Sequence, residues 1–337
     1  MHSSRITPLE IPMNTIVRLS RVAAALALVA LACAKPDAAT TDSSAVRDSM
    51  AAPAAVTGPL PASAKIATLE GMKTPESVRY DADQDIYFVS NINGNPSQKD
   101  NNGFIAKVSA ENPGAPEMFI EGGKNGVTLH APKGMALVGD TLWVADIDAV
   151  RGFNRRTGAL VRSIDLSSKG AAFLNDVAAA PDGSVWITDT GIKFDAKGAM
   201  SPSGKQQVFR IAGTAITSPI IGDSLGNPNG IAWDGANNRW LMAGFSGKDI
   251  VRFTADDHQT FVVASGPGGY DGLEVLPDGR VLVTSWTDST VSVVEGNALR
   301  KLITGVSAPA DIGIDTKRMR LALPRFEGNT VEIWALR

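Results

Sequence analysis

The sequence predicts an all-β protein, a six-bladed β-propeller of four-stranded antiparallel blades. One pattern occurs six times: a polar residue, a small residue, an alternating apolar run, a turn and a second apolar run. The copies begin at Pro75, Pro132, Leu174, Pro228, Tyr270 and Pro309. Their aligned polar positions are 57, 42, 54, 42 and 39 residues apart, and periods of about 40 to 50 residues are typical of propeller blades. After the N-terminal segment no long apolar pattern of helical period occurs, which excludes an α/β or helical fold.

Residues 1–33 are typical of an export signal. Arg18 and Arg21 precede the apolar run Val22–Ala32, whose eleven residues are too few to span a bilayer as a helix. The run ends at Cys33, the only cysteine of the chain, so an intramolecular disulfide is excluded. Translation can start at Met1 or at Met13.

The residues before Cys33 resemble a bacterial lipoprotein signal, in which this cysteine becomes the lipidated N-terminus. The usual leucine lies three residues before the cysteine, whereas Leu31 lies two before it. An ordinary secretory signal is therefore the alternative. Either signal predicts a protein of the bacterial cell envelope, in the periplasm or attached to the outer membrane, which contacts the membrane only through the lipid.

Residues 34–64 are rich in Ala, Ser, Thr and Pro, and such a segment buries too little apolar surface to fold. We expect a flexible tether here and the propeller in residues 65–337.

The formal net charge is -3, and no cluster of Lys and Arg is interleaved with aromatic residues. A nucleic-acid partner is therefore not expected. We expect a monomer that takes a small molecule as substrate or ligand.

Each copy of the pattern predicts a β-hairpin followed by further strands. In the third copy, the turn Pro181–Gly183 separates the apolar runs 177–180 and 185–188, and the fifth copy repeats this Pro-Asp-Gly turn. Third strands are predicted at 103–108, 207–211, 249–253, 290–294 and 330–334, and fourth strands at positions such as 117–121 and 260–264. The sixth copy ends after three strands. The segment Lys65–Gly71 resembles the other fourth strands and is predicted to complete this last blade, which closes the ring and removes an open edge.

The polar residue of each copy begins a strand that lines the channel of a propeller. The aligned positions should form a ring around the axis: Glu76, Lys133, Asn175, Asn229, Asp271 and Ala310. Two carboxylates and two amide oxygens are the donors of a hard-cation site, with Ca²⁺ favoured and Mg²⁺, Mn²⁺ or Zn²⁺ as alternatives. The other interpretation is a set of polar side chains that line a wet channel.

These motifs resemble the senescence marker protein, gluconolactonase and luciferin-regenerating enzyme family. The resemblance rests on the strings from Glu76, Asn175, Asn229 and Tyr270, and it covers nearly all of residues 65–337. It implies a six-bladed propeller with an axial divalent cation. The implied ligands are Glu76, Asn175, Asn229 and Asp271.

The resemblance also implies the opening of a lactone ring. The cation would polarise the lactone carbonyl, and Asp271 would help to deprotonate the attacking water. The chain departs from the family at Ser77 and Val78, where the family has glycine and proline. Phe173 stands where sugar-lactone members tend to carry a substrate-contacting arginine, and an aromatic side chain suits a less polar ligand.

Lys133 adds a cation to the ring and is a second candidate catalytic residue. It could bind a carboxylate or oxyanion of the substrate, or it could pair with Glu76 or Asp271 and compete with the metal. His130 is a candidate acid or base at the mouth, with a solvent-bonded loop histidine as the alternative. Asn91 begins a polar insertion, to about Asn102, which is a candidate lid over a bound substrate.

Several other residues have structural or supporting roles in our interpretation. Asp176 follows a ring residue, and we expect it to bond neighbouring backbone or to orient a ligand. Asp146 and Asp189 end second strands and could lie on the rim, although Asp after a strand is also common turn chemistry. The hairpin tryptophans are predicted to pack between blades: Trp143, Trp186, Trp233 and Trp240.

Two functions are compatible with this pattern. The first is an exported metal-dependent hydrolase of lactones or related esters. The second is a non-catalytic propeller, similar to NHL repeats, that binds a peptide, glycan or small molecule at the envelope. The fold supports both, because function belongs to the site. An ion pair of Lys133 that closes the ring would favour the second.

Overall fold

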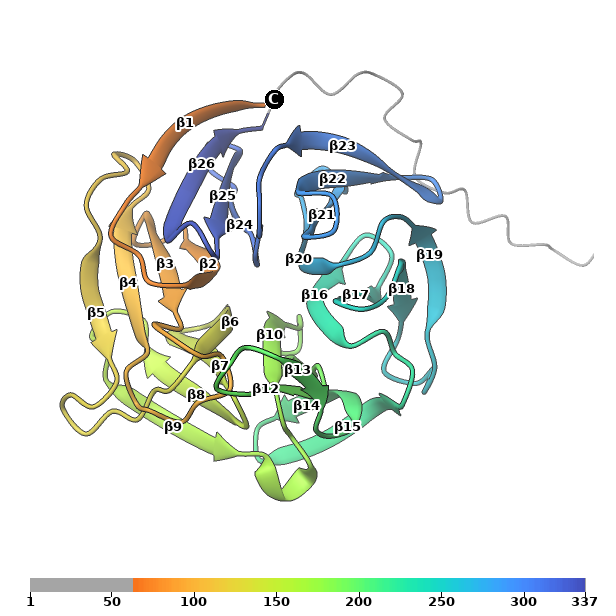
Figure 1. The fold of residues 1–337 in the computed structure, drawn as a ribbon, viewed down its shortest axis with the longest axis horizontal. Coiled ribbons are helices and arrows are strands. Elements are labelled where there is room, and N and C mark those ends of the chain that lie inside the picture. The colour runs from red at the N-terminus through yellow and green to blue at the C-terminus, as the bar shows by residue number, and fades with distance from the viewer. Residues whose placement is uncertain (1–62, 337) are drawn as a thin grey trace, which may run out of the picture. The chain divides into compact units, whose positions relative to one another are not determined.

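The computed structural model describes residues 63–336. The predicted export signal with Cys33, and the tether up to residue 62, lie outside this part. Six four-stranded antiparallel sheets surround a central channel, so the predicted six-bladed propeller is confirmed (Figure 1).

The first strand of each blade lies next to the channel and the fourth lies outermost (Figure 1). Blades 1 to 3 consist of β2 (Pro75–Asp81), β3 (Ile86–Asn91), β4 (Phe104–Ser109) and β5 (Glu117–Glu121); β6 (Pro132–Val138), β7 (Thr141–Asp146), β8 (Ala149–Asn154) and β9 (Leu160–Asp165); β10 (Leu174–Ala179), β11 (Val185–Asp189), β14 (Gln206–Ala212) and β15 (Ala215–Gly222). Blades 4 to 6 consist of β16 (Pro228–Asp234), β17 (Arg239–Gly244), β18 (Asp249–Phe253) and β19 (Phe261–Ser265); β20 (Tyr270–Val275), β21 (Val281–Ser285), β22 (Thr290–Glu295) and β23 (Ala298–Thr304); β24 (Gly313–Asp315), β25 (Arg320–Arg325), β26 (Thr330–Ala335) and β1 (Ala64–Leu69).

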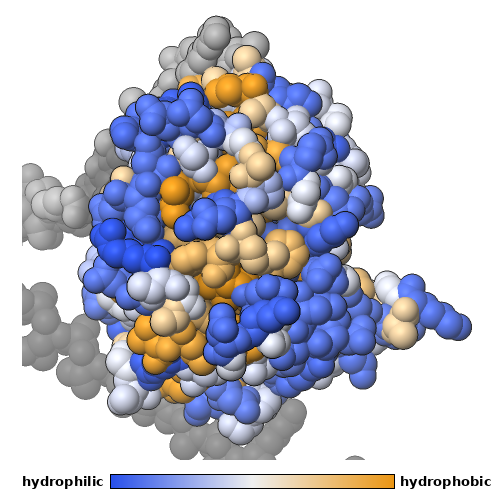
Figure 2. All heavy atoms as spheres, turned by 90° about the vertical axis from the view of Figure 1, so that its left-hand side faces the viewer, coloured by the Kyte–Doolittle hydropathy of each residue, from blue (hydrophilic) through white to orange (hydrophobic). Residues whose placement is uncertain are grey.

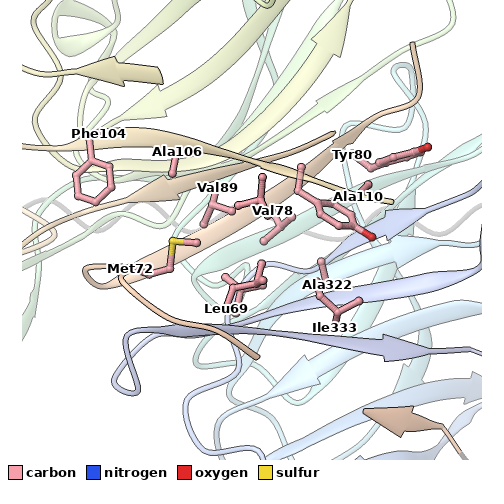
Figure 3. Close-up of a cluster of buried hydrophobic side chains, with 13 residues drawn as sticks. Leu69, Met72, Val78, Tyr80, Val89, Phe104, Ala106, Ala110, Ala322 and Ile333 are labelled. Atoms are coloured by element: carbon pink, nitrogen blue, oxygen red, sulfur yellow. The ribbon is translucent and has the colours of Figure 1, made fainter. Parts of the chain in front are cut away.

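The ring closes through β1, as the sequence predicts. This strand pairs antiparallel with β26, and Leu69 lies opposite Val331. Leu69 is buried in a core shared by blades 1 and 6, together with Val78 and Ile333 (Figure 3). The N-terminal strand β1 and the three C-terminal strands therefore form one blade.

Blade 3 contains a hairpin that the sequence analysis did not predict. Strands β12 (Ile192–Phe194) and β13 (Met200–Pro202) pair with each other between β11 and β14. This insertion accounts for the long spacing of 54 residues between Asn175 and Asn229. Short insertions of this kind carry little apolar periodicity, so the repeat pattern alone does not reveal them.

A β-bulge recurs in the innermost strand of five blades and explains how the axial residues are aimed. Pairing between the first and second strands is regular except just after its first residue pair, where the register shifts. The shifts lie between Pro75 and Val78, Pro132 and Met135, Leu174 and Val177, Pro228 and Ile231, and Tyr270 and Leu273. Each bulge contains one aligned polar residue. Bulges re-aim side chains, so this local irregularity directs the polar residues away from the blade.

In three of the six repeats the residue after the aligned position is a glycine, which allows neighbouring inner strands to approach closely. A Cβ atom on Gly230 would lie 2.3 Å from the backbone oxygen of Asp271, and one on Gly134 would lie 2.4 Å from Cα of Asp176. No side chain larger than hydrogen fits at either position. The glycines therefore permit close contact between these inner strands.

Aromatic side chains fill the space between blades 3 and 4. The rings of Trp186 and Trp240 have centroids 4.7 Å apart, and Trp233 meets Trp240 edge-on. Phe253 completes this cluster. Packing between blades is the role that the sequence analysis assigned to these tryptophans.

The outer strands of the blades expose part of their apolar side chains. Figure 2 views the side on which β5 and β9 lie in Figure 1, and apolar residues gather in patches there among polar ones. Met118, Leu160 and Val161 are among the exposed apolar residues of these two strands.

Within residues 63–336, no helix has the length and apolarity that a membrane span requires.

Candidate functional site

The axial ring consists of the aligned residues Glu76, Lys133, Asn175, Asn229, Asp271 and Ala310. All six side chains are buried, with exposed fractions of 5% or less. Five of them lie in the bulges described above, one on each of five inner strands. The structure therefore places the predicted residues around one channel.

The amide of Asn175 is oriented by a hydrogen bond to Thr190. The Thr190 hydroxyl donates its one proton to the backbone oxygen of Pro228, at 2.8 Å. Its oxygen therefore accepts from Nδ2 of Asn175, at 3.2 Å. This pairing leaves Oδ1 of Asn175 as the free acceptor.

One carboxylate oxygen of Asp271 is held in a similar way. The indole Nε1 of Trp286 donates a hydrogen bond of 2.9 Å to Oδ2. The second oxygen, Oδ1, has no partner in the protein. Asp271 is therefore fixed by one oxygen and can bind a ligand with the other.

Four buried oxygens of the ring lack a hydrogen-bond partner in the protein. They are Oε2 of Glu76, Oδ1 of Asn175, Oδ1 of Asn229 and Oδ1 of Asp271. Buried polar atoms are nearly always paired, and an unpaired one costs about 1 to 3 kcal/mol. Four such atoms in one ring mark a site that favours a bound cation, because all four are acceptors.

The ring contains only two carboxylates, and its other two oxygens belong to amides. Among residues 63–336, no three His, Cys, Asp or Glu side chains form a group that could hold a metal ion. Any cation in the ring would therefore depend on the two asparagines. Carboxylate and amide oxygens without histidine or thiolate suit hard cations.

Burial and mutual repulsion disfavour the charged forms of the ring carboxylates. The pKa of Glu76 is raised well above its ordinary value, first by burial and then by the neighbouring charges of Asp271 and Asp311. Burial likewise raises the pKa of Asp271, and the charge of Asp311 adds to this. A bound cation would oppose both effects.

Lys133 forms no ion pair within 4.0 Å among the described residues. Its Nζ donates a hydrogen bond of 3.1 Å to the backbone oxygen of Ala131. It also lies over the ring of Phe173, 4.3 Å from the centroid. Burial lowers the pKa of Lys133 to about 8, although the charge of Glu76 opposes this. The ring is thus not closed by an ion pair of Lys133.

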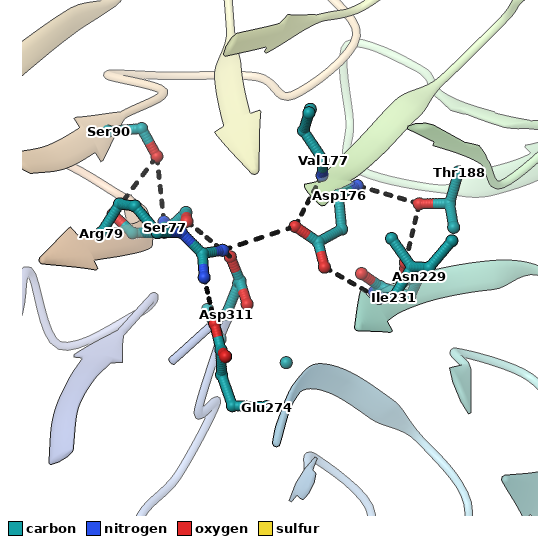
Figure 4. A network of polar contacts seen from close by, with 12 residues as sticks. Ser77, Arg79, Ser90, Asp176, Val177, Thr188, Asn229, Ile231, Glu274 and Asp311 are labelled. Atoms are coloured by element: carbon teal, nitrogen blue, oxygen red, sulfur yellow. Dashed lines mark hydrogen bonds and ion pairs between the residues drawn. The ribbon is translucent and has the colours of Figure 1, made fainter. Parts of the chain in front are cut away.

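A second polar layer lies next to the ring and is centred on Arg79 (Figure 4). The guanidinium forms ion pairs with Glu274, with Asp311 at 3.4 Å and with Asp176 at 3.8 Å. Asp176 also accepts hydrogen bonds from the backbone N–H groups of Val177 and Ile231, at 2.6 and 2.8 Å. Asp176 therefore joins blade 3 to blade 4 through the backbone, and a role in orienting a ligand stays a prediction.

A cavity of about 370 Å³ lies beyond the Arg79 network. Arg79, Glu274 and Trp233 line it, together with the alanines of the inner strands. None of the axial ring residues lines it. This cavity therefore belongs to the other end of the inner strands, and the polar network separates it from the ring.

The profile of one protein family matches residues 74–315, well over half of the 337-residue chain. The profile is described as the SMP-30/Gluconolactonase/LRE-like region. The chain belongs to this family. No curated protein matches the chain in sequence.

Solved structures whose descriptions name a gluconolactonase share the propeller fold of this chain. One structure described as a gluconolactonase has a TM-score of 0.61 at 18% identity, over 82% of this chain and 94% of that chain. A gluconolactonase from Xanthomonas campestris has a TM-score of 0.59 at 18% identity, over 80% and 88%. A catalytically inactive virginiamycin B lyase from Staphylococcus aureus, with quinupristin, has a TM-score of 0.54 at 12% identity, over 82% and 99%. At these identities the likeness shows the fold alone.

The three predicted substrate contacts have different surroundings in this gluconolactonase-like propeller. Phe173 is buried beside Lys133 and the aromatic ring of Phe194. The imidazole Nδ1 of His130 accepts a hydrogen bond from the backbone N–H of Asn101. Asn91 is fully buried, and its side chain bonds the backbone of Lys73 and Val89. Contact of these residues with a substrate stays a prediction, and the bonds of His130 and Asn91 hold loops in place.

Asp146 and Asp189 have structural partners. Asp146 accepts hydrogen bonds from the backbone N–H groups of His130 and Ala131, and it pairs with Arg151. Asp189 accepts bonds from the backbone of Phe173. Both carboxylates thus fix the loops that lead into the inner strands.

The predicted lid contacts the β12–β13 hairpin. Asn95 donates a hydrogen bond of 2.7 Å to the backbone oxygen of Asp195, and the backbone N–H of Phe194 donates one of 2.9 Å to Ser97. These bonds join the insertion of blade 1 to that of blade 3, and the hairpin lies toward the centre of the propeller in Figure 1. The structure therefore brings two insertions together that the sequence analysis did not connect.

A second ring of residues was missed by the sequence analysis. We call it the collar, and it consists of the residue that directly follows the second strand of each blade: Ile92, Ile147, Thr190, Phe245, Trp286 and Phe326. Thr190 and Trp286 bond the ring residues Asn175 and Asp271, so the collar borders the axial ring. An alignment of the six repeats at the residue that follows the second apolar run shows an apolar residue in five of the six copies. This signal could have revealed the collar.

Proposed function

We propose that this family member is a metal-dependent hydrolase that opens a lactone or a related ester. The proposed ligands of the cation are Glu76, Asn175, Asn229 and Asp271, with Ca²⁺ favoured over Mg²⁺, Mn²⁺ and Zn²⁺. The observation that supports this most is the set of four buried, unpaired oxygens in the axial ring. The resemblance of the motifs around these residues to the family implies the same axial divalent cation.

The charge balance of the channel also supports a cation. Its polar layers contain more carboxylates than cationic groups: Glu76, Asp176, Asp271, Glu274 and Asp311 against Arg79 and Lys133. Arg79 pairs with three of the carboxylates, and these lie outside the ring. Glu76 and Asp271 have no such partner among the described ion pairs. A divalent cation would compensate these two charges.

The chemistry needs an activated water and a polarised carbonyl. A bound divalent cation supplies both effects. Asp271 is proposed to accept the proton of the attacking water, and the indole of Trp286 holds its carboxylate in place. A bound cation would lower the pKa of the attacking water, so that little basicity is required of Asp271.

Lys133 is proposed to stabilise the oxyanion that forms when the carbonyl is attacked. Its Nζ donates only one hydrogen bond to the protein, to Ala131, and an ammonium has three protons to donate. A buried donor of this kind stabilises developing negative charge strongly, because little water competes with it. The same group could bind the carboxylate product.

We also propose that the protein is exported and held at the bacterial envelope by a lipid on Cys33. The support is the sequence of residues 18–33. Labelling of growing cells with radioactive palmitate should mark the protein, and Cys33→Ser should abolish the label. A labelled Cys33→Ser variant, or an unlabelled wild type in the periplasm, would contradict lipidation of Cys33. The segment would then be an ordinary secretory signal.

The metal site is tested by titrating the purified protein with Ca²⁺, in calorimetry and in thermal unfolding. Wild type should bind one ion and unfold at a higher temperature, because a ligand that binds only the folded state stabilises it. Asp271→Ala should lose both effects. The exposed Asp256 is a matched control, and Asp256→Ala should behave as wild type.

Hydrolysis is then followed by the acid released from a set of lactones. Activity that requires the cation and Asp271 supports the proposal. Metal binding without hydrolysis of any lactone or ester would favour a binding module at the envelope. If no cation changes the unfolding temperature and none copurifies, the hydrolase proposal is wrong.

A further inference from the structure

We propose that the site is specific for lactones or esters with an apolar alkyl or aryl substituent, and that it discriminates against sugar lactones. This inference rests on the proposed function, because it names the substrate class of the same site. The observations that support it concern the collar and the β12–β13 hairpin.

The aromatic part of the collar forms one continuous apolar surface next to the ring. Trp286 touches Phe245 on one side and Phe326 on the other, with ring centroids 5.5 and 5.3 Å apart. Phe326 in turn packs against the buried side chains of Ile92 and Ile147. The apolar surface therefore extends over blades 4, 5 and 6, and it is backed by the buried Ile92 and Ile147 of blades 1 and 2. Because Phe245, Trp286 and Phe326 are only half-buried, this surface is accessible to a ligand.

The β12–β13 hairpin adds an aromatic wall on the side of blade 3. Phe194 of this hairpin lies against Phe173, with centroids 5.6 Å apart. Phe173 covers the Nζ of Lys133. The bonds of the hairpin to Asn95 and Ser97 hold this wall in place. Apolar surface thus borders both proposed catalytic residues, Asp271 through Trp286 and Lys133 through Phe173.

The collar offers few partners for the hydroxyl groups of a sugar. Thr190 is its only polar aliphatic member, and its hydroxyl already bonds Pro228 and Asn175. The indole N–H of Trp286 is bonded to Asp271. A hydroxyl-rich substrate would lose its hydrogen bonds to water here without replacement, whereas an alkyl chain would gain from burial.

A series of δ-lactones with linear alkyl substituents of increasing length tests this inference. The ratio kcat/KM should rise by about three- to fourfold for each added methylene until the collar is filled, because each methylene leaves water. Glucono-1,5-lactone has the same ring with polar substituents. It should react at least about tenfold less efficiently than the best alkyl lactone, because its hydroxyls stay unpaired.

Two variants locate the effect in the collar. Phe245→Ser and Phe326→Ser should each reduce the gain per methylene, and they should narrow the difference from glucono-1,5-lactone. Phe261 is a matched control, because it lies exposed on the outer strand β19. Phe261→Ser should keep the wild-type dependence on chain length.

Failure of this inference and failure of the proposed function give different results. Hydrolysis of glucono-1,5-lactone with no gain from alkyl substituents would overturn the inference and leave the hydrolase in place. If no lactone or ester is opened, calorimetry with the corresponding alkyl δ-lactams, which resist hydrolysis, tests the apolar surface alone. Lactam affinity that does not increase with chain length would overturn the inference, and an increase that Phe245→Ser reduces would support it.

Discussion

The residue with the clearest supporting role at the site is Trp286. Its indole N–H fixes one oxygen of Asp271, and groups that orient a metal ligand typically change metal affinity by about 10- to 100-fold. We expect Trp286→Phe to weaken Ca²⁺ binding by this factor in calorimetry. Trp143 has no hydrogen-bond partner among the described contacts, so Trp143→Phe serves as the control. Equal affinities in the two variants would contradict the role of Trp286.

Lys133 allows catalysis to be separated from metal binding. Lys133→Met keeps the volume of the side chain and removes a buried positive charge near Glu76. We expect Ca²⁺ affinity to be unchanged or higher, because repulsion of the cation is removed. The rate constant kcat should fall by about 100- to 1,000-fold, as for loss of an oxyanion donor. Loss of metal binding together with activity would show instead that Lys133 holds the ring together.

The residues that sequence reasoning found and missed differ in a physical way. The axial ring was predictable because its members recur at one position of every repeat. Arg79 and Glu274 were missed, although both lie three residues after a ring residue, where the other repeats have alanine or glycine. Charged residues among small ones at such a position indicate a polar layer in the channel. The unpaired state of the ring oxygens depends on packing, which no repeat pattern contains.

At the scale of elements, the approach of inner strands depends on glycine. Gly230→Ala would place a Cβ 2.3 Å from the backbone oxygen of Asp271, and backbone atoms cannot yield as a flexible side chain can. We expect a loss of about 3 kcal/mol in the free energy of unfolding, at the upper end for overpacking. Urea unfolding measures it. Gly114→Ala, whose Cβ would meet only one atom at 3.8 Å, should change stability little. Similar unfolding midpoints for the two variants would show that the strands can separate.

Strands and loops differed in how far the sequence predicted them. Period-two runs and Pro-Asp-Gly turns were sufficient for the blade strands. The β12–β13 hairpin and its bonds to Asn95 and Ser97 were not predicted, because they join segments about 100 residues apart without any shared pattern. The bulges that aim the ring residues were also invisible, since a bulge adds one residue without a compositional signal.

The closure of the whole propeller depends on one strand from the opposite end of the domain. Leu69 of β1 is 2% exposed and packs with residues of blades 1 and 6, whereas Ile66 of the same strand is 46% exposed (Figure 3). Leu69→Ala should therefore lower the free energy of unfolding by about 2 to 5 kcal/mol. Ile66→Ala, on the solvent side, should change it by less than about 1 kcal/mol.

The same pair of variants tests whether the propeller unfolds as one unit. In a closed ring each blade packs on two neighbours, so a weakened closure exposes the edge of β26 and an interface of blade 1 together. We expect Leu69→Ala to shift the entire thermal transition, followed both by tryptophan fluorescence and by far-ultraviolet circular dichroism. Trp334 pairs with Lys65 of β1, so the fluorescence is measured in a Trp334→Phe background. Trp186 and Trp240 lie between blades 3 and 4, far from β1 around the ring, and contribute the signal of the opposite side. A transition in which these tryptophans keep the wild-type midpoint while circular dichroism changes earlier would show that blades unfold independently, and that closure by β1 is a local contact.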